Sequence, residues 1–207
     1  MHAVGDRAVR AGLDAIEVAR NTNGFSGLRH EIAHTAFVHP QDLERFAKLN
    51  TVAEVSPKLW YPNAITSGQI KVLGEDRTHR CHPIASLLSA GALVTYGSDW
   101  PAAAPDANPW PGIAGMLSRQ DPLQRYPGTV GADEAINLAS ALPLFTTNGA
   151  KCMGLEDHIG SLQVGKSADF VQLEKSIFDM SSQEIGAIQV SATIFEGQVV
   201  FGEKILG

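Results

Sequence analysis

The chain has 207 residues, of which 44% are hydrophobic and 18% are charged, as in an ordinary soluble protein with a sizeable core. Its formal net charge of −6 argues against nucleic acid or an anionic membrane as a partner. No apolar run approaches membrane-spanning length, and the two cysteines, Cys81 and Cys152, form no paired motif, so we expect a protein of the cytoplasm.

Residues 1–153 alternate short apolar runs with amphipathic periods, which is typical of a parallel α/β fold. Strands are predicted to end at His34 and to cover 51–56 and the run before Asp99. Helices are predicted over 6–19, 41–49, 84–90, 113–119, 133–145 and 148–153. The Pro- and Gly-rich stretches 57–80 and 101–111 are predicted to be loops.

Residues 154–207 change to a period of two, which indicates strands. We predict strands over 168–173, 190–195 and 198–201. The last two are joined by Glu196-Gly197, a typical two-residue hairpin turn.

Three side chains that can bind a metal follow predicted strands at regular intervals. Asp99 ends the run Leu-Val-Thr-Tyr-Gly-Ser-Asp and is followed closely by Pro101. In a parallel α/β barrel a strand-plus-helix unit takes about 31 residues, and functional groups lie at the carboxyl ends of the strands. His2 and His34 are about one such unit apart, and His34 and Asp99 about two. The spacing favours a shared site over the alternative that Asp99 only caps its own turn.

A competing interpretation comes from His30-Glu31-Ile32-Ala33-His34, which matches the His-Glu-x-x-His pattern of zinc proteases. That site requires a helix that carries both histidines on one face. Turn-like residues precede this segment, His39-Pro40 follows it, and Phe37 stands where the metzincin pattern has glycine. We therefore rank a zinc protease below the shared strand-end site.

Three motifs resemble the metal-dependent amidohydrolase superfamily, in particular the group that contains N-substituted formamide deformylase. They are His-Ala-Val-Gly-Asp-Arg-Ala-Val at 2–9, Gly-Ser-Asp-Trp-Pro at 97–101, and the run Gly-Leu-Glu-Asp-His-Ile-Gly-Ser-Leu-Gln-Val-Gly-Lys-Ser-Ala-Asp-Phe-Val-Gln-Leu at 154–173. The resemblance covers nearly the whole chain but only the second half of a normal family member. It implies the C-terminal half of a TIM-type (β/α)8 barrel over 1–153, with part of an appended small β-sandwich over 154–207.

The same resemblance implies a metal site. His2 and His34 would bind one or two divalent ions, zinc being the first choice, from the fifth and sixth barrel strands. Asp99 would bind metal or carry the catalytic proton, and Arg119 would contact substrate. His79, near the end of the predicted loop 57–80, and Trp100 are further candidates for substrate contact because of their place in the chain. In single-metal relatives His34 contacts water or substrate instead. Ala33 stands where the family usually has glutamate.

The expected activity is therefore metal-dependent hydrolysis of a C–N bond in a small amide or formamide, as part of a longer parent enzyme. The alternative is a catalytically inactive fragment or pseudoenzyme that acts by binding or assembly. A half-barrel has open strand edges and an uncovered apolar face. We therefore expect the 207-residue chain to be inactive in isolation, and either to form a homo-oligomer or to associate with the missing N-terminal half.

Overall fold

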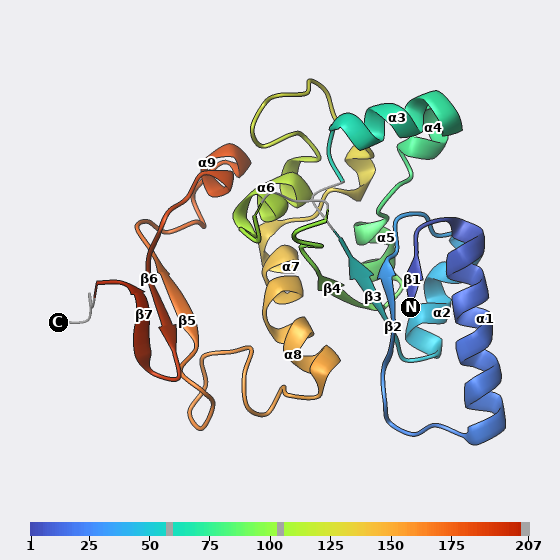
Figure 1. The fold of residues 1–207 in the computed structure, drawn as a ribbon, viewed down its shortest axis with the longest axis horizontal. Coiled ribbons are helices and arrows are strands. Elements are labelled where there is room, and N and C mark those ends of the chain that lie inside the picture. Colours follow the sequence, from blue (N-terminus) through green and yellow to red (C-terminus); the bar gives the residue numbers. More distant parts are fainter. Residues whose placement is uncertain (57–59, 103–105, 204–207) are drawn as a thin grey trace.

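The computed structural model describes residues 1–56, 60–102 and 106–203, and in this part of the chain it contains a four-stranded and a three-stranded sheet (Figure 1). The first sheet is parallel throughout, in the order β1-β2-β3-β4. The second is antiparallel, in the order β5-β6-β7. The predicted combination of an α/β fold with a parallel sheet and a β-rich C-terminal segment is confirmed.

The strands lie close to the predicted runs. The parallel sheet consists of β1 (His2–Ala3), β2 (His30–His34), β3 (Thr51–Val55) and β4 (Leu93–Tyr96). The antiparallel sheet consists of β5 (Phe170–Leu173), β6 (Val190–Phe195) and β7 (Gln198–Gly202).

The helices connect and cover these strands. In chain order they are α1 (Asp6–Asn23), α2 (Leu43–Lys48), α3 (Ala64–Leu73), α4 (Glu75–Thr78), α5 (Ile84–Ser89), α6 (Trp110–Ser118), α7 (Leu138–Ala141), α8 (Thr147–Met153) and α9 (Ser182–Gly186). Short 3-10 helices cover Pro40–Asp42, Ala132–Glu134 and Leu142–Phe145. None of the described helices is both long and apolar enough to span a membrane.

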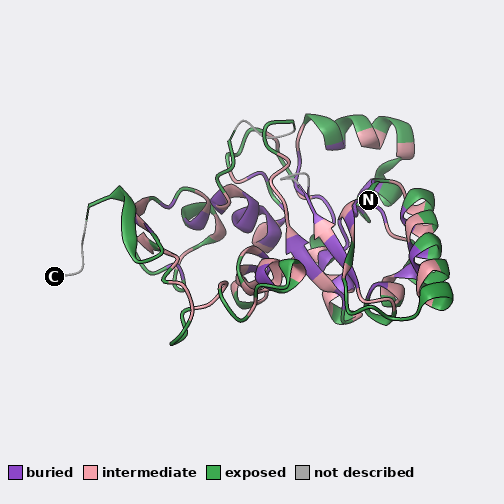
Figure 2. Cartoon of the chain, turned by 60° about the horizontal axis from the view of Figure 1, so that its bottom comes forward, coloured by how far each residue is buried: buried purple, intermediate pink, exposed green. Residues whose placement is uncertain are grey.

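The parallel sheet lies between two groups of helices, as Figure 1 shows. Helices α1 and α2 lie on one side of it, and α7 and α8 lie on the other. The apolar stripe of α1, formed by Val9, Leu13 and Ile16, is buried. Gly12 belongs to the same helix, and a Cβ built there would lie 3.2 Å from the Ile32 side chain of β2. Across the molecule, burial is greatest in the middle, where the strands of the parallel sheet pack against helices (Figure 2).

Two predicted segments differ from the structure. The stretch 57–80, predicted to be a loop, contains α3 and α4 in its described part. Helix α3 begins where Asn63 and Thr66 form a reciprocal capping box, which satisfies otherwise unpaired backbone N–H groups. The helix predicted over 133–145 is broken into shorter pieces, and Asn137 caps a new start by accepting from the Ser140 N–H.

The C-terminal segment has the predicted hairpin. Glu196 and Gly197 both have positive φ, 49° and 76°, as a type I′ turn between antiparallel strands requires. Helix α9 joins this segment to the rest of the molecule, because Ile185 is 1% exposed within the main apolar core. The division into domains between residues 153 and 154 stays a prediction.

Candidate metal centre

His2 and His34 lie side by side at one edge of the parallel sheet. They belong to neighbouring strands, β1 and β2, which are paired so that Ala3 is opposite His34. The two imidazole rings meet edge to face, with 4.4 Å between their centroids and 74° between their planes. Two residues separated by a complete helix and strand are thus brought into contact at the end of β2.

Hydrogen bonds hold His34 in place at the end of its strand. Its backbone N–H donates to Glu54 Oε2 at 2.9 Å, and its ring Nδ1 lies 2.7 Å from Ser56 Oγ. Ser56 Oγ in turn donates to Glu54 Oε2 at 3.1 Å. His34 has φ +72°, a backbone conformation that is uncommon for a residue with a side chain. The contacts with the next strand stabilise this turn.

Glu54 has a half-buried carboxyl group. Burial raises its pKa above the ordinary value, while the hydrogen bonds from the His34 N–H and the Ser56 hydroxyl act in the opposite direction. Gly97, which follows β4, leaves room for it, because a Cβ built at this position would lie 2.0 Å from Glu54 Oε1. The carboxyl group therefore touches both the end of β2 and the turn after β4.

Asp99 lies in that turn after β4. Its side chain is half-buried and its φ is +50°. Nowhere in residues 1–56, 60–102 and 106–203 do three or more His, Cys, Asp or Glu side chains come together in an arrangement that could hold a metal ion. His2, His34 and Asp99 therefore form no such group in this part of the chain, and the metal-binding roles predicted for them stay predictions. Asp99 belongs to the turn of β4, and β3 lies between that strand and β2. The chemical role of Asp99 stays a prediction.

The donor atoms of the histidine pair fit a divalent metal such as zinc. Imidazole nitrogen is a preferred zinc ligand. A histidine that binds metal usually makes a hydrogen bond through its other ring nitrogen, and His34 already makes such a bond to Ser56. His2 and His34 would thus supply two ligands from adjacent strands.

The zinc-protease interpretation is wrong for this structure. Residues His30–His34 form strand β2 and not a helix, so the pattern does not place two histidines on one helical face. Glu31, which would activate water in such a protease, accepts a hydrogen bond from Cys152 Sγ of α8 at 3.2 Å instead.

Arg119 does not contact solvent, contrary to the prediction that it binds substrate. The residue is 0% exposed at the end of α6. Its guanidinium group donates to three backbone carbonyls, those of Val130, His82 and Cys81, at 2.8, 3.1 and 2.9 Å. These bonds occupy all three guanidinium nitrogens, so Arg119 ties together three parts of the fold.

The other two predicted substrate contacts are accessible. Trp100 is 57% exposed in the turn after Asp99. His79 is exposed beside α4, and its Nδ1 accepts a weak bond from the Gly131 N–H at 3.4 Å. It lines a shallow pocket with Glu75, Asp76 and Arg80, whereas the hydrogen-bond partners of His34 are Glu54 and Ser56. Contact of either residue with substrate stays a prediction.

Sequence reasoning missed Glu54 and Ser56. A signal was present, because Glu54 is a charged residue in the otherwise largely apolar run Thr51–Val55, which forms a strand. A carboxyl group buried in such a strand requires hydrogen-bond partners. The sequence did not reveal that His34 would be one of them.

Comparisons with known proteins agree on one family for this chain. The profile described as "Amidohydrolase family" matches residues 1–201. The protein LONG AFTER FAR-RED 3 of Arabidopsis thaliana is 34% identical over 202 residues, which are 97% of this chain and 33% of that protein. N-substituted formamide deformylase of Arthrobacter pascens is 29% identical, over 95% of this chain and 35% of the enzyme.

A solved structure shares the fold. An uncharacterized metal-dependent hydrolase from Pyrococcus furiosus superposes with a TM-score of 0.61 at 30% identity, covering 81% of this chain and 31% of that one. The present chain thus spans about a third of the length of the relatives it matches.

Proposed function

Since this chain belongs to the amidohydrolase family, we propose that it forms the metal-binding part of a hydrolase that cleaves a C–N bond in a small amide or formamide. The observation that carries the proposal is the contact between His2 and His34 at the ends of adjacent parallel strands, with their ring centroids 4.4 Å apart. In parallel α/β barrels, catalytic groups lie at these strand ends.

The residues have separate tasks in this proposal. His2 and His34 hold a divalent ion, with zinc as the first choice and one or two ions per site. When bound, such an ion polarises the scissile carbonyl and makes water more acidic. Asp99 accepts a proton from the water that attacks the carbonyl carbon. As the C–N bond breaks, the carboxyl group returns this proton to the leaving nitrogen. Trp100 and His79, both exposed, contact the substrate.

The proposed architecture follows from the family. The parallel sheet β1–β4 corresponds to the fifth to eighth strands of a (β/α)8 barrel, and β5–β7 belong to an appended β-sandwich. The edge strand β7 supports the idea that this arrangement needs a partner surface, because all five of its residues are exposed. We propose that the polypeptide which completes it is either the N-terminal part of the parent enzyme or a second copy of this chain, in the cytoplasm.

Zinc binding by the metal-depleted 207-residue chain tests the metal site. We expect zinc to bind, and both His2→Ala and His34→Ala to abolish binding measured by competition with a chromogenic chelator. His30→Ala is the matched control, because His30 lies on the same strand as His34 and belongs only to the protease pattern. Wild-type chain that binds no zinc, or zinc binding that depends on His30, would contradict the proposal.

Turnover separates an enzyme part from an inactive fragment. We expect the isolated chain with zinc to hydrolyse formamides and small amides negligibly, because metal affinity and reactivity depend on a complete set of ligands. Supplying the N-terminal part of a relative should then restore turnover, and Asp99→Asn should remove it. Restored turnover that survives Asp99→Asn would exclude the proposed proton transfer.

A further inference from the structure

The hydrogen bonds around His34 form a closed ring that starts and ends on the same residue. His34 Nδ1 is hydrogen-bonded to Ser56 Oγ, Ser56 Oγ is hydrogen-bonded to Glu54 Oε2, and Glu54 Oε2 is hydrogen-bonded to the backbone N–H of His34. The three distances are 2.7, 3.1 and 2.9 Å, all within ordinary hydrogen-bond range. Ser56 is 2% exposed, so water does not compete freely for its hydroxyl group.

The direction of each hydrogen bond can be worked out from the His34 backbone N–H, which can only donate. A backbone N–H is always a donor, so Glu54 Oε2 is an acceptor. The Ser56 hydroxyl hydrogen is directed at the same oxygen. With its hydrogen used in this way, Ser56 Oγ accepts from the His34 ring, which places a proton on Nδ1.

We propose that Ser56 and Glu54 are positioning residues that hold the His34 imidazole in its Nδ1–H tautomer and leave Nε2 as the nitrogen with a free lone pair. The tautomer of a histidine is set by the hydrogen bond that its other nitrogen makes. Free histidine side chains favour the opposite tautomer, with the proton on Nε2. The consequence for zinc rests on the proposed function, whereas the tautomer does not.

The position of Glu54 in this arrangement depends on Gly97. Its carboxyl group is wedged against Gly97, where any Cβ would collide with Oε1. Glycine at position 97 therefore leaves the space that the carboxyl group occupies beside Ser56 and the His34 N–H. Because Gly97 lies two residues before Asp99, the same carboxyl group lies against the turn that carries Asp99.

The tautomer is measured directly by long-range 1H–15N NMR of the histidine rings in the metal-free 207-residue chain, at mildly alkaline pH. We expect the wild-type His34 to show a protonated Nδ1 and an unprotonated Nε2. Ser56→Ala removes the acceptor, so the Nε2–H tautomer should become the major one. Zinc affinity should fall about 10- to 100-fold, as for other partners of metal ligands. Ser56→Thr, which keeps a hydroxyl, should restore the wild-type spectrum.

Matched controls come from a second Ser–Glu pair elsewhere in the chain. Ser86 donates to Glu134 through its backbone N–H at 3.0 Å and its hydroxyl at 2.5 Å, with no histidine involved. Ser86→Ala and Glu134→Gln should leave the His34 spectrum unchanged. Glu54→Gln should shift the tautomer measurably, because a neutral amide oxygen accepts more weakly than a carboxylate. The shift should be smaller than in Ser56→Ala, because the Ser56 hydroxyl that accepts from His34 is still present.

The outcomes separate the two proposals. If the tautomer changes in Ser56→Ala but wild-type chain binds no zinc, the proposed function fails and the positioning role stands. If His34 keeps its wild-type tautomer in folded Ser56→Ala, the positioning role is overturned, whatever happens to zinc. Should Ser56→Ala fail to fold, Glu54→Gln decides, since an unchanged His34 spectrum in that variant overturns the proposal equally.

Discussion

Strands β3 and β7 differ in how far the rest of the molecule covers them. In β3, Thr51, Val52, Ala53 and Val55 are all buried, because helices lie on both sides of the parallel sheet. In β7 all five residues are exposed, and Val200 and Phe201 are 62% and 59% accessible. Figure 2 shows the contrast between the buried middle and the exposed end of the molecule. The stability of the described fold therefore depends on the parallel sheet, which also carries the candidate site.

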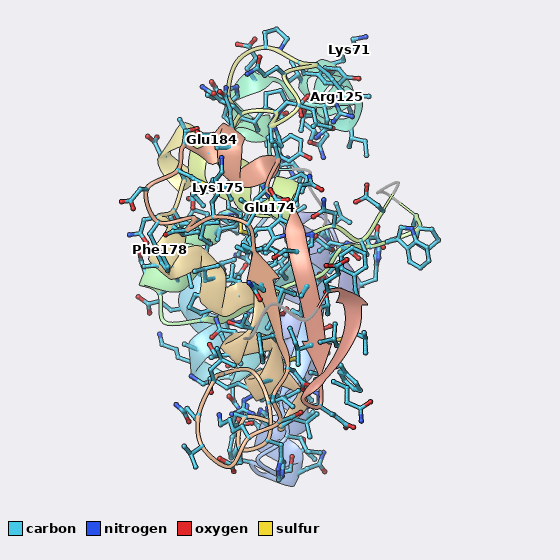
Figure 3. The ribbon with its side chains drawn as sticks, turned by 90° about the vertical axis from the view of Figure 1, so that its left-hand side faces the viewer. Lys71, Arg125, Glu174, Lys175, Phe178 and Glu184 are labelled. Atoms are coloured by element: carbon cyan, nitrogen blue, oxygen red, sulfur yellow. The ribbon has the colours of Figure 1, made fainter. Side chains whose placement is uncertain are left out.

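The same contrast applies to two glutamates. Glu54 lies in β3, where burial raises its pKa. Glu184 lies in α9, where hydrogen bonds from the Ser181 hydroxyl and N–H lower its pKa. Figure 3 shows Glu184 at the surface, with Lys175 from the same C-terminal segment. One carboxyl group is thus harder to ionise than in the unfolded chain, and the other is easier.

Removing a core aromatic residue should give the largest effect. Phe46 of α2 is 0% exposed, and Phe46→Ala should lower the free energy of unfolding by about 3–5 kcal/mol, through lost burial and a new cavity. Phe201→Ala in β7 is the matched control and should change it by about 0.5 kcal/mol or less. Urea unfolding followed by circular dichroism measures both. Equal effects would show that β7 is covered in solution, for example by a second copy of the chain.

Replacing Arg119 should come next. Arg119→Leu leaves the buried carbonyls of Val130 and Cys81 without a donor, whereas that of His82 still accepts from the Ile84 N–H. The loss should lower the free energy of unfolding on the order of 3 kcal/mol. Arg80→Leu, at an exposed position, is the control and should have little effect. A folded, stable Arg119→Leu variant that had lost only substrate binding would restore the substrate role predicted from the sequence.

The smallest effects concern pH. Because the pKa of Glu54 is raised on folding, the folded state binds this proton more tightly than the unfolded state. Its contribution to stability therefore decreases as the pH rises from the unfolded value, 4.5, through the folded one. Glu54→Gln should remove that decrease, so the variant's melting temperature should fall less than that of wild type over this range.

Glu184 should behave in the opposite sense. Its pKa is lowered on folding, so its contribution is present above 4.5 and is lost as the pH falls through the folded value. Glu184→Gln should flatten the acid side of the stability curve. Thermal unfolding of the two variants between acid and neutral pH measures both slopes. Slopes of the same sign would contradict the assigned environments.

The sequence by itself determined the elements whose signals are local. The amphipathic period of residues 6–19 specified α1, and Glu196-Gly197 specified the hairpin between β6 and β7. The regular spacing of His2 and His34 was enough to predict that they lie at neighbouring strand ends. Such features depend on residues close together in the chain or on a repeated unit length.

Only the tertiary structure decided what surrounds these residues. Arg119 was predicted to contact substrate, yet its partners include a carbonyl 38 residues away at Cys81. The closed set of hydrogen bonds at His34 depends on the register between β2 and β3. This register brings Glu54 and Ser56 next to His34, which lies 20 and 22 positions earlier in the chain. A one-residue shift in that register would turn Glu54 to the other face of the sheet. Burial and hydrogen bonding at the site therefore follow from strand pairing, which no local pattern in the chain specifies.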